Sequence, residues 1–373
     1  MILSDTIFKR EERAIFSLRQ LYREYGYARY QVSKFEEYDL YAHNKSFLVS
    51  ENILTFTDTN GKLMALKPDV TLSIVKNVDL DLIKTHKVYY NETVYRTSAG
   101  SDGFREIMQA GLECIGEIDL YEICEVLMLA ERSLALISED SILDLSHMGF
   151  VRGLLQEAGI ADADVPRLLG YVGNKNTSEI RAYGAKNGIS EKMIQTLCRI
   201  TELYAPLDRA LAEIEPLICG EKMRAAYGEL CEVADVMRRY GNTNRLYLDF
   251  SMIQDMRYYN GIVFRGYING IPDSILSGGR YDKLIRKMGK QGGAIGFAVY
   301  LDALERLDTM AERFDADVLL ICDADVSASA VIERVEALRS EGKSVRVARE
   351  DENAARCRET VRLGADGNGG AQA

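Results

Sequence analysis

The chain has 373 residues, of which 47% are hydrophobic and 28% are charged, an ordinary globular composition. At about 100–200 residues per domain, this length allows two or three domains. No window approaches the roughly 18 apolar residues of a membrane span, and the N-terminus lacks the apolar core of a secretion signal. We therefore expect a cytoplasmic protein with no membrane partner.

The net charge and the positions of the cysteines and histidines argue against several further kinds of partner and site. The net charge is −11, whereas nucleic-acid binding draws on clustered Lys and Arg, so we expect no nucleic-acid partner. The seven cysteines form no C-x-x-C pair, and an odd count argues against a disulfide framework. The three histidines, His43, His86 and His147, are far apart in sequence. We therefore predict neither a metal site nor a cofactor.

Turn signals divide the first part of the chain into short elements. Helical spacing over 9–25 predicts a helix that Gly26 ends, followed by a strand at about 27–33. Residues 54–67 alternate around Asn60-Gly61, which predicts a β-hairpin with a type I′ turn. The stretch from Pro68 predicts a helix that ends at about Asn77.

The middle of the chain changes from strand patterns to helix patterns and back. Two strands at 87–96 and 105–116, joined by a polar loop, are expected to pair antiparallel. The later elements are a helix at 119–138, a strand at 143–150, a helical insertion at about 151–243, strands at 245–252 and 258–267, a glycine turn into a helix at 274–289, and a strand or turn entering a helix at 294–307.

The C-terminal pattern predicts a second, small domain. Residues 314–363 contain a β-α-β pattern, and the glycine-rich tail 364–373 is predicted to be disordered. The preceding residues 1–310 are expected to form one core domain. Many antiparallel strands with helices beside them indicate an α+β fold. Neither a dinucleotide-binding G-x-G-x-x-G after a first strand nor a Walker A sequence is present.

Several segments, in order, resemble the histidyl-tRNA synthetase family. They are the hairpin and "R-P-E-x-T" segment at 55–71, motif 2 at 95–116, histidine-specific segments at 256–264 and 276–282, and motif 3 at 294–304. The resemblance covers about residues 5–305. It implies a class II aminoacyl-tRNA synthetase-like antiparallel sheet that is flanked by helices.

The same resemblance implies a pocket for histidine. The histidine-binding positions of the family fall on Asp69, Thr71, Arg96, Gln109, Glu113, Tyr258 and Tyr259. Acidic and hydroxyl groups suit an α-ammonium, and a carboxylate or phenol suits an imidazole N–H. Gln109 and Glu113 are four apart on one predicted strand and so share a face. Alternation would place Tyr258 and Tyr259 on opposite faces, so only one need line the pocket.

The positions for ATP activation depart from the family. Gln254 stands where the family has its catalytic arginine, which contacts the histidine carboxylate and the α-phosphate. Ala303 stands at the motif 3 arginine that holds the γ-phosphate, and Tyr300 could fill space that ATP would use. Losing one such donor costs about 100–1,000-fold in rate. We therefore expect no adenylation and name no catalytic residue.

A synthetase-like chain with these losses resembles the regulatory subunits of short-form, hetero-octameric ATP phosphoribosyltransferase. That resemblance implies a non-catalytic role in the first step of histidine biosynthesis. It also implies self-association as a dimer, a catalytic ATP phosphoribosyltransferase subunit as partner, and allosteric feedback by L-histidine.

Two other functions remain open at this point, and so do plainer structural roles for the residues. The chain fits a divergent active histidyl-tRNA synthetase, or a ligand-free synthetase-like adaptor or RNA-binding protein. From spacing alone, Asp69, Thr71, Gln109 and Glu113 also fit a solvated sheet face. The tyrosine pair also fits a core, and GGRYD at 278–282 also fits a simple turn.

Overall fold

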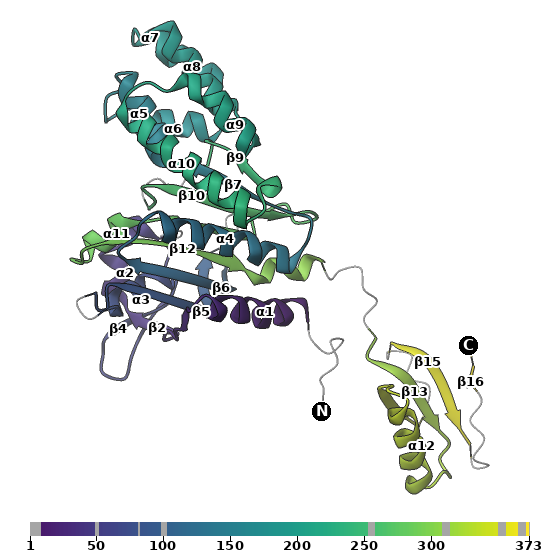
Figure 1. Cartoon of the computed structure of the whole chain (residues 1–373). Coiled ribbons are helices and arrows are strands. Elements are labelled where there is room, and N and C mark those ends of the chain that lie inside the picture. Colours follow the sequence, from purple (N-terminus) through teal and green to yellow (C-terminus); the bar gives the residue numbers. More distant parts are fainter. Residues whose placement is uncertain are drawn as a thin grey trace. The chain divides into compact units, whose positions relative to one another are not determined.

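The computed structural model describes residues 9–48, 52–80, 83–97, 103–252, 258–307, 314–349, 356–364 and 371–372. The chain divides into two compact units, Met1–Leu307 and Asp308–Ala373 (Figure 1). Within the described part, none of the helices combines the length and apolar character that a membrane crossing requires.

The first unit is built on a nine-stranded sheet. Its strand order is β1-β5-β6-β12-β11-β10-β7-β9-β8, and every neighbouring pair from β5 to β7 is antiparallel. The strands are β1 (Ala28–Arg29), β5 (Thr85–Thr97), β6 (Phe104–Gly116), β7 (Ser141–His147), β8 (Ala205–Pro206), β9 (Leu246–Leu248), β10 (Ile262–Ile268), β11 (Leu276–Arg280) and β12 (Gly293–Tyr300). Segments far apart in sequence thus become neighbours in the centre of the sheet.

Alternation along the strands gives the large sheet two buried faces. On β5, Tyr89 joins the larger core, whereas its neighbours Val88 and Tyr90 join a second core. On β6, Leu112 joins the larger core and Ile115 joins the second. Because successive side chains point to opposite faces, Gln109 and Glu113 lie on the face of the second core.

Helices cover the face of the larger core. α1 (Arg10–Glu24) packs on α4 (Leu120–Ile137), and α4 contacts β7, β10, β11 and β12. The N-terminus of α4 is set by Asp119, whose carboxylate accepts from the backbone N–H of Tyr121 at 2.7 Å. Glu122 completes the reciprocal capping pair. This covered face leaves the opposite face available for a site.

The predicted helical insertion consists of six helices. They are α5 (Met148–Glu157), α6 (Val165–Gly173), α7 (Thr177–Lys186), α8 (Glu191–Glu202), α9 (Leu207–Ile214) and α10 (Glu221–Tyr240). Figure 1 shows them as the teal and green bundle beyond β7. The first helix begins at Met148, immediately after β7, so the strand predicted to run to 150 ends three residues earlier. His147 ends that strand, and its Nδ1 accepts from the backbone N–H of Gly149.

The first unit also contains a small three-stranded sheet with the strand order β2-β4-β3. It contains β2 (Phe35–Glu37), β3 (Thr55–Thr57) and β4 (Leu63–Leu66), with α2 (Tyr38–Ala42) and α3 (Thr71–Asn77) next to it in sequence. The predicted hairpin 54–67 is confirmed, but its turn is not type I′. Gly61 has a φ of 78°, whereas Asn60 has no positive φ. Asp58 instead accepts from the backbone N–H groups of Asn60 and Lys62.

The second unit is a four-stranded sheet in the order β14-β13-β15-β16. Its elements are β13 (Ala316–Cys322), α12 (Ala328–Ser340), β14 (Val345–Ala348), β15 (Cys357–Leu363) and β16 (Ala371–Gln372). The predicted β-α-β pattern is therefore extended by a third parallel strand. The prediction of a disordered tail is wrong for Ala371–Gln372, which pair antiparallel with β15. Residues 365–370 and 373 lie outside the described part.

The fold class is confirmed as α+β with a large sheet and flanking helices. Two further local predictions are wrong. The strand predicted at 27–33 is limited to Ala28–Arg29. The glycine turn predicted before α11 (Asp282–Lys287) is strand β11, where Gly278 and Gly279 pair with both neighbouring strands. A Cβ on Gly278 would lie 2.4 Å from the carbonyl oxygen of Gly296, so this strand needs glycine for close approach.

Candidate functional site

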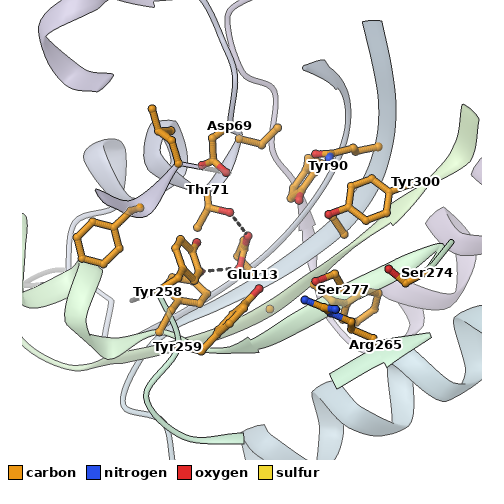
Figure 2. A pocket seen from close by; sticks show the side chains of 18 of the residues that line it. Asp69, Thr71, Tyr90, Glu113, Tyr258, Tyr259, Arg265, Ser274, Ser277 and Tyr300 are labelled. Carbon is orange, nitrogen blue, oxygen red and sulfur yellow. Dashed lines mark hydrogen bonds between the residues drawn. The ribbon is translucent and has the colours of Figure 1, made fainter. Parts of the chain in front are cut away.

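A cavity of about 470 Å³ opens on the face of the second core. Its walls come from β5, β6, β10, β11 and β12 and from the segment that leads into α3. The lining residues include Asp69, Thr71, Tyr90, Arg96, Gln109, Glu113, Tyr258, Tyr259, Arg265, Ser274, Ser277, Tyr281 and Tyr300 (Figure 2). This volume is within the range of ordinary small-molecule sites.

All seven residues predicted to bind histidine line this one cavity. They therefore do not form a solvated sheet face. Tyr258 and Tyr259 both line it, so the prediction that alternation separates them is wrong. The reason is that β10 begins only at Ile262, and the two tyrosines precede it. Their rings pack edge to face, with centroids 4.8 Å apart.

We call the part of the cavity formed by Asp69, Thr71, Glu113, Tyr258 and Tyr259 the acidic end. We call the part formed by Arg265, Ser274, Ser277 and Tyr300 the arginine end. Figure 2 shows the two groups on opposite sides of the cavity.

The Glu113 carboxyl group is fixed by two hydroxyl donors. Thr71 Oγ1 donates to Oε1 at 2.6 Å, and the Tyr281 hydroxyl donates to Oε2 at 2.5 Å. Gly296 lies directly opposite Glu113 in the β6–β12 ladder. A Cβ there would lie 1.9 Å from Glu113 Oε2. The carboxyl group therefore occupies the space that a side chain at position 296 would take.

Burial sets the protonation of Glu113. Desolvation raises the pKa of Glu113 to about 8, assisted by the charge of Asp69 and opposed by the bonds from Thr71 and Tyr281. Because only 3% of its surface is exposed, Glu113 is largely protonated at neutral pH. A cation that enters the acidic end would favour the ionised form.

Asp69 lines the cavity and also stabilises the start of α3. Its Oδ1 accepts from the backbone N–H of Leu72 at 2.8 Å, at the start of α3. Arg96 lies beside it, with Nη2 3.9 Å from Asp69 Oδ2 and Nε donating to the carbonyl of Pro68 at 2.7 Å. Desolvation raises the pKa of Asp69, while Arg96 and the backbone donors act in the opposite direction.

Gln109 carries an unpartnered donor into the site. The side chain is 2% exposed, and its Nε2 has no hydrogen-bond partner among the described residues. Leaving such a buried donor unpaired costs about 1–3 kcal/mol. Because Gln109 lines the cavity, this donor indicates a ligand with an acceptor group.

The sequence prediction missed several residues of the cavity. Tyr281 lies within the segment 276–282 that resembles a histidine-specific motif, but it was not named among the pocket residues; its hydroxyl donates to Glu113, which is 168 positions away in the sequence. Arg265, Ser274 and Ser277 form most of the arginine end. The period-2 pattern of 258–267 could have placed Arg265 on one face of a strand, but nothing local showed which face lines the cavity.

Of the two positions predicted to have lost a catalytic arginine, the structure describes only one. Gln254 lies outside the described residues. Ala303 is in the 3-10 helix η5 (Leu301–Leu307) and packs against the larger core. Tyr300, at the end of β12, lines the cavity. No cluster of three or more His, Cys, Asp or Glu suited to a metal is present among the residues that the structure describes.

Comparison with known proteins places the chain in a family. The family model described as histidyl-tRNA synthetase matches residues 3–304. An ATP phosphoribosyltransferase regulatory subunit of Clostridium acetobutylicum is 26% identical over 340 residues, which cover 88% of this chain and 83% of that protein.

Two solved structures share the fold. A structure described as an ATP phosphoribosyltransferase regulatory subunit/histidyl-tRNA synthetase of Bacillus halodurans aligns with a TM-score of 0.75 at 24% identity, over 92% of this chain and 91% of that one. A chain of an ATP phosphoribosyl transferase (HisG:HisZ) complex from Thermotoga maritima aligns with a TM-score of 0.63 at 21% identity, over 78% and 97%. The resemblance recognised in the motifs is thus confirmed, and the chain belongs to the histidyl-tRNA synthetase family.

Proposed function

We propose that this chain is a non-catalytic regulatory subunit of a cytoplasmic ATP phosphoribosyltransferase, and that L-histidine bound in the cavity acts as its feedback signal. The observation that carries the proposal is the convergence of seven separated residues, from Asp69 to Tyr259, on one cavity. Relatives that match most of the chain are named as this regulatory subunit. The Thermotoga maritima neighbour belongs to a complex of that transferase.

The chemistry of the acidic end supports histidine as the ligand. Asp69 and Thr71 offer acceptors to an α-ammonium. That cation favours the ionised form of Glu113, whose carboxylate can then accept a hydrogen bond from an imidazole N–H. The tyrosine rings supply flat apolar surface for the imidazole. The adaptor alternative required a blocked pocket, whereas a cavity of about 470 Å³ is open here.

An active histidyl-tRNA synthetase is the second candidate, because the family model carries that description. Gln254 and Ala303 argue against it, since both positions lack the cation that the family uses on ATP. Histidine- and ATP-dependent pyrophosphate exchange separates the two candidates. The regulatory function predicts no exchange above a reaction without protein.

Reconstitution tests the proposed function. The chain is mixed with a short-form catalytic ATP phosphoribosyltransferase subunit, and the complex is isolated by size-exclusion chromatography, which also reports dimerisation and a hetero-octamer. We expect phosphoribosyl transfer to require this chain and to fall when L-histidine is added. Feedback needs histidine to bind one state of the assembly better than another. The proposal would be contradicted if no complex forms, or if the rate of phosphoribosyl transfer is the same with and without this chain.

A further inference from the structure

A second cavity, of about 310 Å³, lies where α5 and α10 pack against each other beside the end of β7. It is lined by His147, Gly149, Arg152, Lys222, Ala225, Ala226 and Glu229. None of these seven residues lines the cavity proposed for histidine. Its volume is at the lower end of the range for small-molecule sites, so it has room for a small ligand.

Two cations line this second cavity and have donors that no protein group takes. Arg152, on α5, is exposed, and it forms no hydrogen bond or ion pair within the described part of the chain. Lys222, in the first turn of α10, donates to Gln156 Oε1 at 2.7 Å, and an ammonium has three donors. Arginine binds phosphate through two parallel hydrogen bonds, and lysine adds a point charge. The two side chains therefore suit a phosphate group.

Positive charge on α11 adds to these two cations. Desolvation lowers the pKa of Lys283, and the charges of Arg152 and Arg286 lower it further. These three cations are therefore close enough to repel one another. The neighbouring ion pair of Arg280 and Asp282 adds no net charge. Because the whole chain carries a net charge of −11, such a local excess of cations favours an anionic ligand at this place.

One carboxylate, that of Glu229, lines the same cavity. Its Oε1 lies 3.1 Å from His147 Nε2, and His147 Nδ1 accepts from the backbone N–H of Gly149. The ring hydrogen is therefore on Nε2 and is donated to Glu229. Desolvation acts to raise the pKa of Glu229, but the hydrogen bond from His147 and the charge of Arg280 hold it below its ordinary value. An ionised carboxylate with a fixed orientation thus lines the cavity.

This combination of charges discriminates between kinds of small ligand. Inorganic phosphate would be repelled by Glu229 and would make no use of its acceptor oxygens. A neutral amino acid carries no net charge, so the excess of cations would contribute little to its binding. A sugar phosphate fits both parts, because its phosphate carries a charge of about −1.5 to −2 and its hydroxyl groups donate to a carboxylate.

We propose that the second cavity is a binding site for a sugar phosphate, in which Arg152 and Lys222 hold the phosphate and Glu229 accepts hydrogen bonds from the sugar hydroxyl groups. His147 is a positioning residue, because it acts through Glu229. The site gives the chain a second ligand besides histidine. This inference does not depend on the proposed function, because the two cavities share no lining residue.

Calorimetry with three probes tests the assignment. Ribose 5-phosphate, inorganic phosphate and ribose are each titrated into the full chain at fixed ionic strength, in a buffer without phosphate. We expect ribose 5-phosphate to bind with a Kd below about 1 mM, and about tenfold more tightly than phosphate or ribose. In Arg152→Gln we expect its affinity to fall about 10–100-fold, the range for a hydrogen bond to a charged group. Arg152→Lys keeps the charge and should retain part of the affinity.

The variant Glu229→Gln separates the sugar from the phosphate. The amide keeps an oxygen that can accept from His147, but it has no negative charge. We expect the affinity for ribose 5-phosphate to fall about tenfold, because bonds from hydroxyl groups to a charged acceptor are lost. The affinity for inorganic phosphate should stay the same or rise, because a repulsive charge is gone. A merely structural role of Glu229 would weaken both probes alike, and that result would overturn its assignment.

Two controls complete the test. Arg209→Gln removes an exposed arginine of the same helical insertion, which pairs with Glu213 on α9, and should change no affinity. L-Histidine should bind Arg152→Gln as it binds the wild-type chain, because Arg152 lies outside the histidine cavity. The inference would be overturned if ribose 5-phosphate did not bind the wild-type chain, or if its affinity were unchanged in Arg152→Gln. A loss of histidine binding in Arg152→Gln would also overturn it, since the second cavity would then hold an amino acid.

Discussion

The two ends of the cavity differ in how complete they are without a ligand. At the acidic end, both oxygens of Glu113 accept hydroxyl bonds, and Asp69 accepts from the start of α3. Beside the arginine end, the Nε2 donor of Gln109 has no partner among the described residues. The acidic end is thus preorganised by the protein, whereas the other end leaves a bond for the ligand to make. Preorganisation favours affinity because less ordering remains at the moment of binding.

The largest effect on histidine affinity is expected from a variant that removes the carboxyl group of Glu113 from the acidic end. Glu113→Ala takes away the acceptor for the imidazole and leaves the hydroxyls of Thr71 and Tyr281 without their partner. We expect histidine affinity to fall by more than about 100-fold in calorimetry, since a lost charged hydrogen bond and two unpaired donors act together. Glu117→Ala removes a carboxylate that is 73% exposed and should leave affinity unchanged. Retained affinity in Glu113→Ala would refute the assignment of the acidic end.

The protonation of Glu113 gives the next prediction. Its pKa is about 8 in the folded chain and 4.5 as the ordinary value, so the folded state holds a proton that the unfolded state has released. Between these two values, stability therefore falls as pH rises, by at most about 1.4 kcal/mol per pH unit. Urea unfolding at pH 5.5, 6.5 and 7.5 should show this slope relative to Glu113→Gln. If the free energy of unfolding changed with pH equally in the wild-type chain and in Glu113→Gln, the pKa of Glu113 would not be raised in the folded chain.

A smaller effect is expected from the glycine that makes room for Glu113. Gly296→Ala would place a Cβ 1.9 Å from Glu113 Oε2, so the carboxyl group or the strand must move. We expect unfolding to become easier by about 1–3 kcal/mol, the usual cost of overpacking, together with weaker histidine binding. Gly228→Ala, in α10 with nothing within 4 Å, is the control and should be neutral or slightly stabilising. Equal behaviour of the two variants in unfolding and in calorimetry would contradict this account of Gly296.

The smallest effect should follow the loss of one hydroxyl. Tyr281→Phe removes one of the two donors that hold Glu113, and we expect histidine affinity to fall about tenfold, as for one hydrogen bond to a charged group. Tyr22→Phe removes a buried hydroxyl that pairs with Ser133 on the other face of the sheet. That variant should lose stability without losing histidine affinity. A change of affinity in Tyr22→Phe as large as in Tyr281→Phe would mean that Tyr281 acts only through general stability.

The acidic end was largely predictable from sequence, and the arginine end was not. Gln109 and Glu113 share a face because four residues along a strand is a simple rule, and the strand was evident. Tyr258 and Tyr259 broke the same rule, since their segment is not part of β10. Arg265 and Ser277 meet only through the pairing of β10 with β11. That register joins segments through long-range contacts, which local periodicity does not report.

The roles of Tyr281 and Gly278 were likewise not predictable from local sequence patterns. A glycine pair followed by a polar run resembles a turn in local propensity, yet Gly278 and Gly279 form the middle of strand β11. The close approach of the Gly296 carbonyl explains the glycine at 278, and it depends on a strand that begins 15 positions later, from Gly278 to Gly293. Tertiary packing overrode local preference at this point.

The most direct test of the account is a calorimetric titration of L-histidine into the chain, alone and in complex with a short-form catalytic ATP phosphoribosyltransferase subunit. The account predicts one histidine per chain with a Kd in the micromolar range, about −8 kcal/mol, and loss of the binding heat in Glu113→Ala. No histidine binding in either form would contradict it.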